Sequence, residues 1–569
     1  MNTLTFAYFS IEFFVDPTIP TYAGGLGILA GDTIRAAADL GLSAVGVTLL
    51  HRKGYFHQYL DSEGKQSESD AHWFPEELLE KLPIRVQVNA AGRQIQVQAW
   101  RYLARSESGH SVPVYFLDTS IPENTAWDQS LTDCLYGGDA RYRLGQEFIL
   151  GFAGVAMLRA LGYLKVQAYH MNEGHSALVT LALLEEQMWG RGLHAVEPAD
   201  RESISQHCVF TTHTPLAVGH DEFSIDLVRE VLGNERTNFL IEAQCCGNGF
   251  LNMTNLALNF SRYVNGVSMR HEEVTRNIFS NHQIGAITNG VHAVTWTSPA
   301  FRQLYDRFLP QWRRDNFYLR YAIGMPLDEI WKAHTEAKQE LIAEVERRTN
   351  MHLDPEVMTI GFARRAAEYK RHDLLFHDLE RLELMAQRGW RLQIIYGGKA
   401  HPRDEVGRLL IRKVFEAAKT LENCMPVVYL EEYNVALAKL VCSGVDLWLN
   451  TPQKPQEASG TSGMKAALNG VPTFSILDGW WIEGHLEGVT GWSIGDGWQS
   501  ETNIEKEVAS LCDKLEQVIV PMYYKQPKQF VSIMRSAISI NGSYFNTQRM
   551  VTQYLQNAYL PNTDWHNNK

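Results

Sequence analysis

The sequence predicts an α/β protein made of two doubly wound, Rossmann-like domains. Two observations carry this prediction: short β-rich segments alternate with helical segments, and polar clusters directly follow several of the predicted strands. Alternation of this kind produces parallel sheets covered by helices. Ligands of such sheets bind beyond the carboxyl ends of the strands. The polar clusters are therefore the first candidates for a functional site.

In the first half of the chain, a glycine-rich turn opens an apolar helical stretch over residues 24–40, and a strand is predicted over residues 43–50. Two more strands, over residues 165–169 and 208–212, lead directly into polar residues. We assign these segments to a first Rossmann-like domain over residues 1–292.

The second half shows the alternation more clearly. Helices are predicted over residues 403–419 and 435–442, and the second domain over residues 293–569. An amphipathic helix near residues 532–560 can pack back on the first domain. Five strands are predicted, over residues 359–363, 392–396, 427–430, 446–449 and 472–476.

Composition excludes several classes of protein. Of 569 residues, 45% are hydrophobic and 21% charged, as in a folded globular protein. Lys and Arg number 52 and Asp and Glu 65, so the net charge of 52 − 65 = −13 does not fit a nucleic-acid-binding protein. The most apolar stretch, residues 148–164, is at the lower limit for spanning a bilayer and contains Arg159, so no transmembrane helix is expected.

Targeting and metal signals are weak. The first 14 residues lack a basic region and contain Glu12, so they do not resemble a signal peptide. Seven cysteines without a CxxC pair indicate neither a zinc site nor a disulfide framework. No other metal-ligand pattern is present, and a reducing cytoplasm is the simplest location.

The segment from Glu457 to Gly470, EASGTSGMKAALNG, is the most distinctive motif. Thr461 or Ser462 can cap the start of a short helix that Gly470 ends. Free N–H groups at such a start favour an anion, and the helix dipole disfavours a charged Lys465 in the first turn. An uncharged lysine is what Schiff-base chemistry with a carbonyl cofactor needs. The alternative is a solvated lysine on a Gly/Ser loop.

A basic cluster, RRAAEYKR over residues 364–371, follows a predicted strand of this acidic chain. Arginines there suit a ligand with two or three negative charges, because guanidinium groups bind oxyanions in a bidentate way. The alternative is a salt-bridged helix face, since Arg364 and Glu368 are four residues apart.

The remaining clusters are less specific. The turn Tyr22 to Gly27 opens a helix, where glycines allow a phosphate to approach the backbone, although an ordinary glycine turn is the commoner explanation. His213 follows one strand, the segment 172–175 (NEGH) follows another, and Asn289-Gly290 is a similar set. A lone histidine in such a place is more often structural than catalytic.

Together these strings resemble the α-glucan phosphorylases, which act on glycogen, starch or maltodextrin. The segment 457–470 resembles the family's pyridoxal-phosphate segment. Other family landmarks occur in the same order along the chain, at residues 22–29, 172–175, 213, 289–290, 365–371, 397–400 and 429–438. The resemblance implies a GT-B type glycosyltransferase architecture, two Rossmann-like domains facing a central cleft, and the chain length fits the short prokaryotic-type branch.

The resemblance also implies roles for individual residues. Lys465 forms the Schiff base with pyridoxal 5′-phosphate, and Arg365 and Lys370 hold the substrate phosphate; with His213 these are the implied catalytic residues. No metal is implied. The other residues implied at the cofactor are Thr461, Ser462, Arg364, Tyr433, Gly24 and Gly25. Those implied at the substrate are Gly25, Leu26, Asp139, His213, Asn289, Tyr369, Glu457, Ser459 and Gly460.

The reaction implied is phosphorolysis: inorganic phosphate releases α-D-glucose 1-phosphate from the non-reducing end of an α-1,4-glucan, with retention. Members of the family are commonly homodimers. Three departures stand out: Arg364 is often lysine in the family, Ser462-Gly463-Met464 replaces the usual Gly-Asn-Met, and the match at Asp139 is weak. Two alternatives remain open, a nucleotide-sugar glucosyltransferase similar to glycogen synthase and without pyridoxal phosphate, and an inactive glucan-binding homologue.

Overall fold

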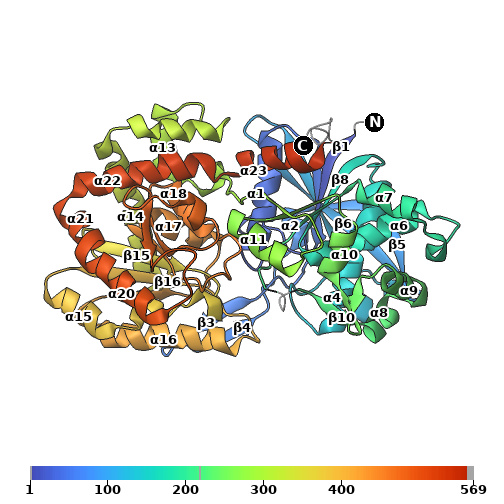
Figure 1. Cartoon of the computed structure of the whole chain (residues 1–569), viewed down its shortest axis with the longest axis horizontal. Helices are drawn as coiled ribbons and strands as arrows, with labels where there is room; N and C mark the ends of the chain where they lie inside the picture. Colours follow the sequence, from blue (N-terminus) through green and yellow to red (C-terminus); the bar gives the residue numbers. More distant parts are fainter. Residues whose placement is uncertain (1–2, 217–219, 561–569) are drawn as a thin grey trace. The chain divides into compact units, whose positions relative to one another are not determined.

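The computed structural model describes residues 3–216 and 220–560, and the chain divides into two compact units. Figure 1 colours the chain along its sequence. Unit 1 comprises Met1–Phe56, Asp70–Ile287 and Met550–Lys569, and unit 2 comprises His57–Ser69 and Thr288–Arg549. The single boundary predicted at residues 292 and 293 is a simpler division than this one, because the chain crosses between the units several times.

Unit 2 is built on a parallel sheet whose described strands follow the order β17-β16-β15-β18-β19-β20. Counted from β15, this is the order 3-2-1-4-5-6 of the Rossmann fold, whose topological switch point lies between the first and fourth strands. The predicted strands are confirmed to within one residue. The strands are β15 (Met358–Ala363), β16 (Leu392–Gly397), β17 (Val427–Leu430), β18 (Leu447–Asn450), β19 (Thr473–Ile476) and β20 (Gly491–Ile494).

Unit 1 has the same parallel core, extended at one edge. Its described strands follow the order β14-β13-β9-β8-β1-β2-β7-β6-β5, and β5 and β6 pair antiparallel. The switch point lies between β1 and β8. The strands are β1 (Leu4–Phe9), β2 (Ala44–Leu49), β5 (Glu80–Ala90), β6 (Arg93–Arg105), β7 (Ser111–Asp118), β8 (Val166–Asn172), β9 (Cys208–Thr211), β13 (Tyr263–Gly266) and β14 (Gly285–Ala286).

Both faces of the unit 1 sheet are buried, because successive side chains of a strand point to opposite faces. On β1, Ala7 and Phe9 belong to one apolar cluster, and Phe6 and Tyr8 to another. Helix α1 (Gly25–Asp39) and residues of the last helices contribute to the second cluster. The two-faced burial explains why the strands of the Rossmann core read as continuous apolar runs.

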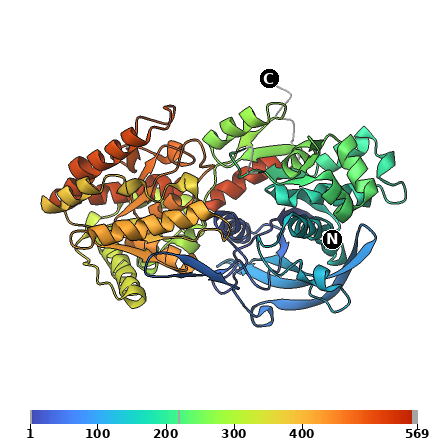
Figure 2. The same cartoon turned by 90° about the horizontal axis from the view of Figure 1, so that it is seen from below.

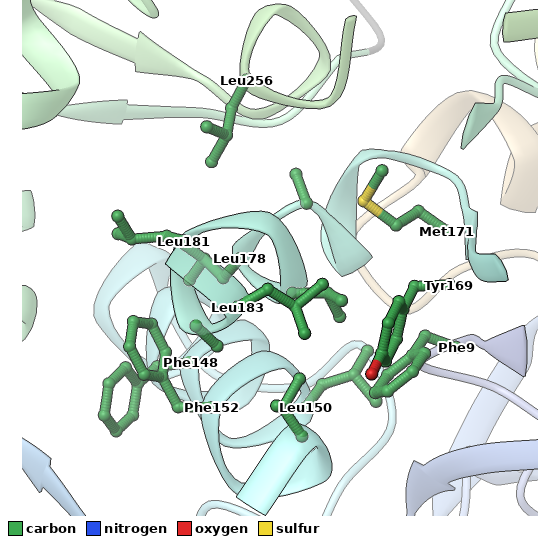
Figure 3. Packing of buried hydrophobic residues seen from close by; sticks show 14 of the residues in the cluster. Phe9, Phe148, Leu150, Phe152, Tyr169, Met171, Leu178, Leu181, Leu183 and Leu256 are labelled. Carbon is green, nitrogen blue, oxygen red and sulfur yellow. The ribbon is translucent and has the colours of Figure 1, made fainter. Parts of the chain in front are cut away.

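Most of the apolar stretch 148–164 is a buried helix, which ends at Ala160; Leu164, beyond it, is exposed. The helix continues α4 (Ala140–Phe148) through a π-helical turn, and in Figure 3 Phe148 and Phe152 lie beside Leu178 and Leu181 of α6 (Leu178–Gln187). Within the described residues, no helix combines the length and the apolar character that crossing a bilayer requires.

The chain end differs from the prediction of one amphipathic helix over residues 532–560. Helix α22 (Pro527–Ser536) runs into a π-helical turn, a break follows near residues 543–546, and α23 (Thr547–Tyr554) continues the chain. The residues from Met550 onward belong to unit 1. There, Tyr559 Oη lies 2.5 Å from His170 Nδ1 of β8, and aromatic stacking joins Phe6 and Tyr559.

A buried ion cluster ties the longest helix of unit 2, α14 (Leu327–Thr349), to the sheet. Lys338 Nζ donates to Asp446 Oδ2 at 2.6 Å, His334 Nε2 lies 2.8 Å from Asp446 Oδ1, and all three side chains are buried. Thr359 N also donates to Asp446 Oδ2, at 2.7 Å. Burial raises the pKa of Asp446, but Lys338 and His334 outweigh it and lower that pKa below its ordinary value.

We expect Asp446→Ala to destabilise unit 2 by about 3–5 kcal/mol, because it leaves the ammonium of Lys338 buried without its counter-ion. Urea unfolding followed by circular dichroism measures the change. The matched control is Glu344→Ala on the same helix, where Arg347 and Arg348 pair with Glu344 near the surface. Solvent screens that cluster, so its loss should cost under about 1 kcal/mol; equal losses would contradict the argument.

Candidate functional site

The basic cluster lies at the carboxyl end of β15, directly at the switch point of unit 2. Arg364 N donates to Gly397 O at 3.0 Å and Ala366 N to Lys399 O at 2.9 Å, so this segment runs beside the one that follows β16. A short 3₁₀ turn begins only at Glu368. Arg364 is therefore outside any helix, and the alternative of a salt-bridged helix face is wrong.

Two buried cations share one carboxylate at this point. Arg364 Nη2 and Lys370 Nζ each lie 2.5 Å from Glu457 Oε2, and all three side chains are less than 10% exposed. Burial raises the pKa of Glu457, but Arg364 and Lys370 outweigh it and lower that pKa to about 2. Two cations against one anion leave one net positive charge. Arg364 Nη1 is buried and has no hydrogen-bond partner among the described residues, so the cluster can accept a further anion.

Lys465 lies close to this cluster in the sequence and is also buried. It belongs to α18 (Ser462–Ala467), is 5% exposed, and places Nζ 3.9 Å from the centre of the Trp296 ring. The predicted cap is wrong: Thr461 precedes the helix, but its side chain makes no capping hydrogen bond. The dipole argument also fails, because in a six-residue helix Lys465 lies as near the last turn as the first. Lys465 is instead buried against the indole ring of Trp296. This burial rules out the alternative of a solvated surface lysine.

The other predicted residues of unit 2 lie on loops near these groups. Tyr433 follows β17, and a Cβ atom at Gly397 would lie 3.1 Å from its ring. Tyr369 packs beneath Lys370, whose Nζ is 4.4 Å from the ring centre. A Cβ atom at Gly460 would lie 3.6 Å from Arg364 Nη2. Tyr369 and Gly460 thus lie against Lys370 and Arg364, and Tyr433 lies beside Gly397.

Four further predicted residues have different surroundings. Ser462 Oγ accepts a hydrogen bond from Trp448 Nε1 at 3.1 Å, and the Ser459 hydroxyl, 3% exposed, donates to Gly460 O at 3.3 Å. Arg365, by contrast, is exposed and lies outside the Glu457 ion cluster. Asn289 belongs to unit 2, although the predicted boundary placed it in the first domain; its carbonyl accepts a hydrogen bond from Arg549, and its buried Oδ1 has no partner within the described ranges.

In unit 1, a carboxylate holds the glycine-rich turn in place. Glu12, 3% exposed, accepts hydrogen bonds from Ala23 N at 2.7 Å and Gly24 N at 3.2 Å. Tyr136 Oη donates to the other oxygen of Glu12 at 2.9 Å. No role for Glu12 or Tyr136 was predicted from the sequence. The one available signal was that Glu12 is an acidic residue inside an apolar run.

The same region places the remaining glycines and Asp139. A Cβ atom at Gly24 or Gly25 would meet no described atom within 4 Å, so the backbone at the start of α1 is open to a ligand; Leu26 is the next residue of that helix. Asp139 is exposed, and its Oδ1 accepts a hydrogen bond from Tyr142 N at 2.9 Å as the cap of α4. The Asp139 side chain thus serves as the N-terminal cap of α4.

His213 lies beside the carboxyl end of β8. Its Nε2 is 2.6 Å from Asn172 Oδ1, and its backbone N donates to Glu173 Oε2 at 2.7 Å. Burial lowers the pKa of His213 to about 3, so the ring is neutral near pH 7. Because Asn172 Oδ1 can only accept, the proton resides on Nε2 and Nδ1 is an acceptor.

The site residues are thus gathered by the strand ends of each unit. In unit 2 the structure brings together Arg364, Lys370 and Glu457. Lys465, which follows Glu457 closely in the sequence, is also buried. In unit 1 it places the glycine turn and His213 at the switch point between β1 and β8. In the described part of the chain, no group of three or more His, Cys, Asp or Glu side chains has a metal-binding arrangement.

Sequence comparison with known proteins identifies the family of this chain. Residues 235–491 match a family model described as carbohydrate phosphorylase. The chain is 37% identical to the maltodextrin phosphorylase of Thermococcus litoralis over 97% of its own length and 70% of that protein's. It is 33% identical to the glycogen phosphorylase of Aquifex aeolicus, covering 97% of this chain and 85% of the relative. An uncharacterized protein of Methanocaldococcus jannaschii is 31% identical over 97% of this chain and 99% of its own.

The chain therefore belongs to the carbohydrate phosphorylase family, a family of glycosyltransferases, and the predicted resemblance is confirmed. The relatives named above come from archaea and bacteria, in agreement with the prokaryotic-type branch.

Removing the shared carboxylate should make the cluster dependent on an added anion. In Glu457→Gln, Arg364 and Lys370 stay buried without the charge that neutralises them, and we expect a loss of about 3–5 kcal/mol in stability. Inorganic phosphate should raise the melting temperature of this variant more than that of the wild type, because it replaces the missing charge. Differential scanning fluorimetry in phosphate and chloride at equal ionic strength makes the comparison.

The control is Glu507→Gln, which removes the buried partner of Arg371 at 2.6 Å. It should lose stability without selective rescue by phosphate. Equal rescue of both variants would show a general salt effect instead of an anion site.

Proposed function

We propose that the protein is an α-1,4-glucan phosphorylase, a hexosyltransferase that uses inorganic phosphate to release α-D-glucose 1-phosphate from the non-reducing end of glycogen, starch or maltodextrin, with retention. The observation that carries the proposal is the buried cluster of Arg364, Lys370 and Glu457 at the switch point of unit 2. A cluster that retains a net positive charge and an unpartnered guanidinium nitrogen suits phosphate chemistry.

We infer that the resident cofactor is pyridoxal 5′-phosphate, held covalently by Lys465. The donor set fits the group: a buried amine for its aldehyde, the Tyr433 ring for its pyridine, and Arg364 with Thr461 and Ser462 for its phosphate. Gly24 and Gly25 complete the set that the family resemblance assigns to it. When bound, the cofactor supplies a phosphate that exchanges a proton with the substrate phosphate.

The chain's own residues then bind and orient the reactants. Lys370 and Arg365 neutralise the substrate phosphate, which lowers the electrostatic repulsion between neighbouring anions in a site of low dielectric. Neutral His213, fixed by Asn172, positions the glucosyl unit without adding charge. The other residues assigned to the glucosyl unit and phosphate are Gly25, Leu26, Asp139, Asn289, Tyr369, Glu457, Ser459 and Gly460.

We further propose that the enzyme works in the cytoplasm as a homodimer. All seven cysteines are free thiols, which suits a reducing compartment. The dimer is what the family resemblance implies.

Phosphorolysis and cofactor attachment can be tested together. Purified protein incubated with maltodextrin and phosphate should form glucose 1-phosphate, and borohydride should fix the cofactor to the peptide that contains Lys465. Lys465→Ala should abolish the label and lower activity by several orders of magnitude. A label on another peptide, or no glucose 1-phosphate from labelled wild-type protein, would overturn the proposal.

Two glycines of the same turn separate ligand binding from folding. A Cβ atom at Gly25 enters open space, whereas one at Gly27 would lie 2.7 Å from Glu12 Oε2. We expect Gly25→Ala to keep the wild-type melting temperature but to raise KM for phosphate about tenfold to a hundredfold, because a methyl group prevents a charged hydrogen bond to the backbone.

Gly27→Ala should instead lower stability by about 1–3 kcal/mol through overpacking. Thermal denaturation and phosphate kinetics on both variants check the contrast. An unchanged KM for phosphate in Gly25→Ala would show that this turn is not part of the phosphate site.

A further inference from the structure

A β-hairpin from the first part of the chain is built into unit 2. It consists of β3 (His57–Leu60) and β4 (Gln66–Ser69), which pair antiparallel. In Figures 1 and 2 it lies against α16 (Glu405–Leu421), where Leu60 packs on Ala366, Ala400 and Ile411. The hairpin tip fits closely, since a Cβ atom at Gly64 would lie 2.5 Å from the Phe415 ring.

Two buried glutamines of the hairpin bond to the loop that follows β16. Gln58 is 0% exposed, and its Nε2 donates to Gly398 O at 3.0 Å and to Gln66 Oε1 at 2.8 Å. Gln66 donates to Ala400 O at 2.8 Å and accepts from Ala400 N at 3.0 Å. Buried amides with several partners at good distances fix the backbone of that loop.

Gln58 also fixes the residue that precedes Tyr433. Gln58 N donates to Glu432 Oε2 at 2.6 Å, and Glu432 N donates to Gln58 Oε1 at 3.0 Å. Glu432 has a φ of +52°, a left-handed conformation that non-glycine residues seldom adopt. Lys399 Nζ donates to Glu432 Oε1 at 2.6 Å. This conformation persists because the surrounding bonds determine it.

We propose that Gln58 is a positioning residue for the cofactor ring: it holds Glu432 in the left-handed conformation and so directs Tyr433 toward the side of Gly397. The inference rests on the proposed function, because Tyr433 is the residue assigned to the pyridine ring. The Gln58 side chain holds the backbone N–H of Glu432, the Gln58 backbone N–H holds the Glu432 carboxylate, and Tyr433 is the next residue. Gln58 thus acts through Glu432 and does not itself touch the cofactor.

The experiment compares Gln58→Leu with Gln393→Leu in the full-length protein. Gln393 is the matched control, because it is 1% exposed in the same unit and has a comparable set of bonds, to Asp354 and Thr359. It lies near the amino end of β16, away from the loops that follow the strands. Both variants should lose a similar amount of melting temperature.

Pyridoxal phosphate is the probe, added back to stripped protein and followed by near-ultraviolet absorbance. We expect its dissociation constant to rise about tenfold in Gln58→Leu, because the Glu432 amide loses its acceptor, the side-chain oxygen of Gln58. In Gln393→Leu the constant should rise less than twofold. Hydrogen exchange at the amides of residues 431–433 should accelerate about tenfold only in Gln58→Leu. If Gln58→Leu does not fold, Lys399→Met removes another bond to Glu432 and should weaken cofactor binding several-fold.

Equal changes in cofactor affinity for Gln58→Leu and Gln393→Leu would overturn the inference and leave Gln58 a purely structural residue. Wild-type protein that takes up no pyridoxal phosphate would overturn the proposed function, and the assignment of Gln58 with it. Faster exchange at residues 431–433 together with weaker cofactor binding, both specific to Gln58→Leu, supports the positioning role.

Discussion

The desolvation of charge at the switch point of unit 2 is the constraint on which the site depends. Taking an arginine and a lysine out of water costs several kcal/mol per ion unless an anion accompanies them. Glu457 is that anion, and one of its oxygens lies 2.5 Å from each cation. Because two cations face one carboxylate, these three side chains together keep one positive charge, which suits the cluster to a further anion.

Loops that carry the site residues are held in strained conformations by acidic or amide side chains. Tyr136, Glu173 and Glu432 have φ values of +56°, +82° and +52°, in a region that non-glycine residues seldom adopt. Glu173 and Glu432 lie just after strands, and Tyr136 lies between α3 (Ala126–Ser130) and α4. Each makes a side-chain hydrogen bond: Tyr136 to Glu12, Glu173 to His213, and Glu432 to Gln58. The geometry of the site is thus specified by partners that are distant in the sequence, which is why substitutions at those partners act on the loops.

Most of the fold could be predicted from the sequence, because apolar β-rich runs and amphipathic helices have distinct periods. The strands of unit 2 illustrate this, as do the polar residues that follow them. The hairpin at residues 57–69 could not be predicted, since its attachment to unit 2 depends on tertiary contacts of Gln58 and Gln66 that leave no local pattern. The break after α22 was missed for a similar reason. The amphipathic sequence pattern continues through the break, although the helix itself is interrupted there.

The candidate site divides in the same way. Lys465 and the basic cluster were found because glycines, serines and repeated cations are unusual in those places. Glu12 was not, because a single carboxylate within an apolar run carries no periodic signal. The prediction that Lys465 lies in an unusual environment rested on a helix dipole, whereas its surroundings come from packing on Trp296.

Buried histidines with lowered pKa values occur in the candidate sites of both units, His213 in unit 1 and His372 in unit 2. Burial lowers the pKa of both His213 and His372 to about 3, and His372 Nε2 lies 3.3 Å from Arg364 O. Glu457, with a pKa of about 2, is ionised over the same range. Between about pH 5 and 8 these three groups keep constant charges, although histidine ordinarily titrates there. A phosphate monoester such as that of the proposed cofactor has a second pKa of about 6, so once bound it would be the group whose protonation changes, against a protein environment of fixed charge.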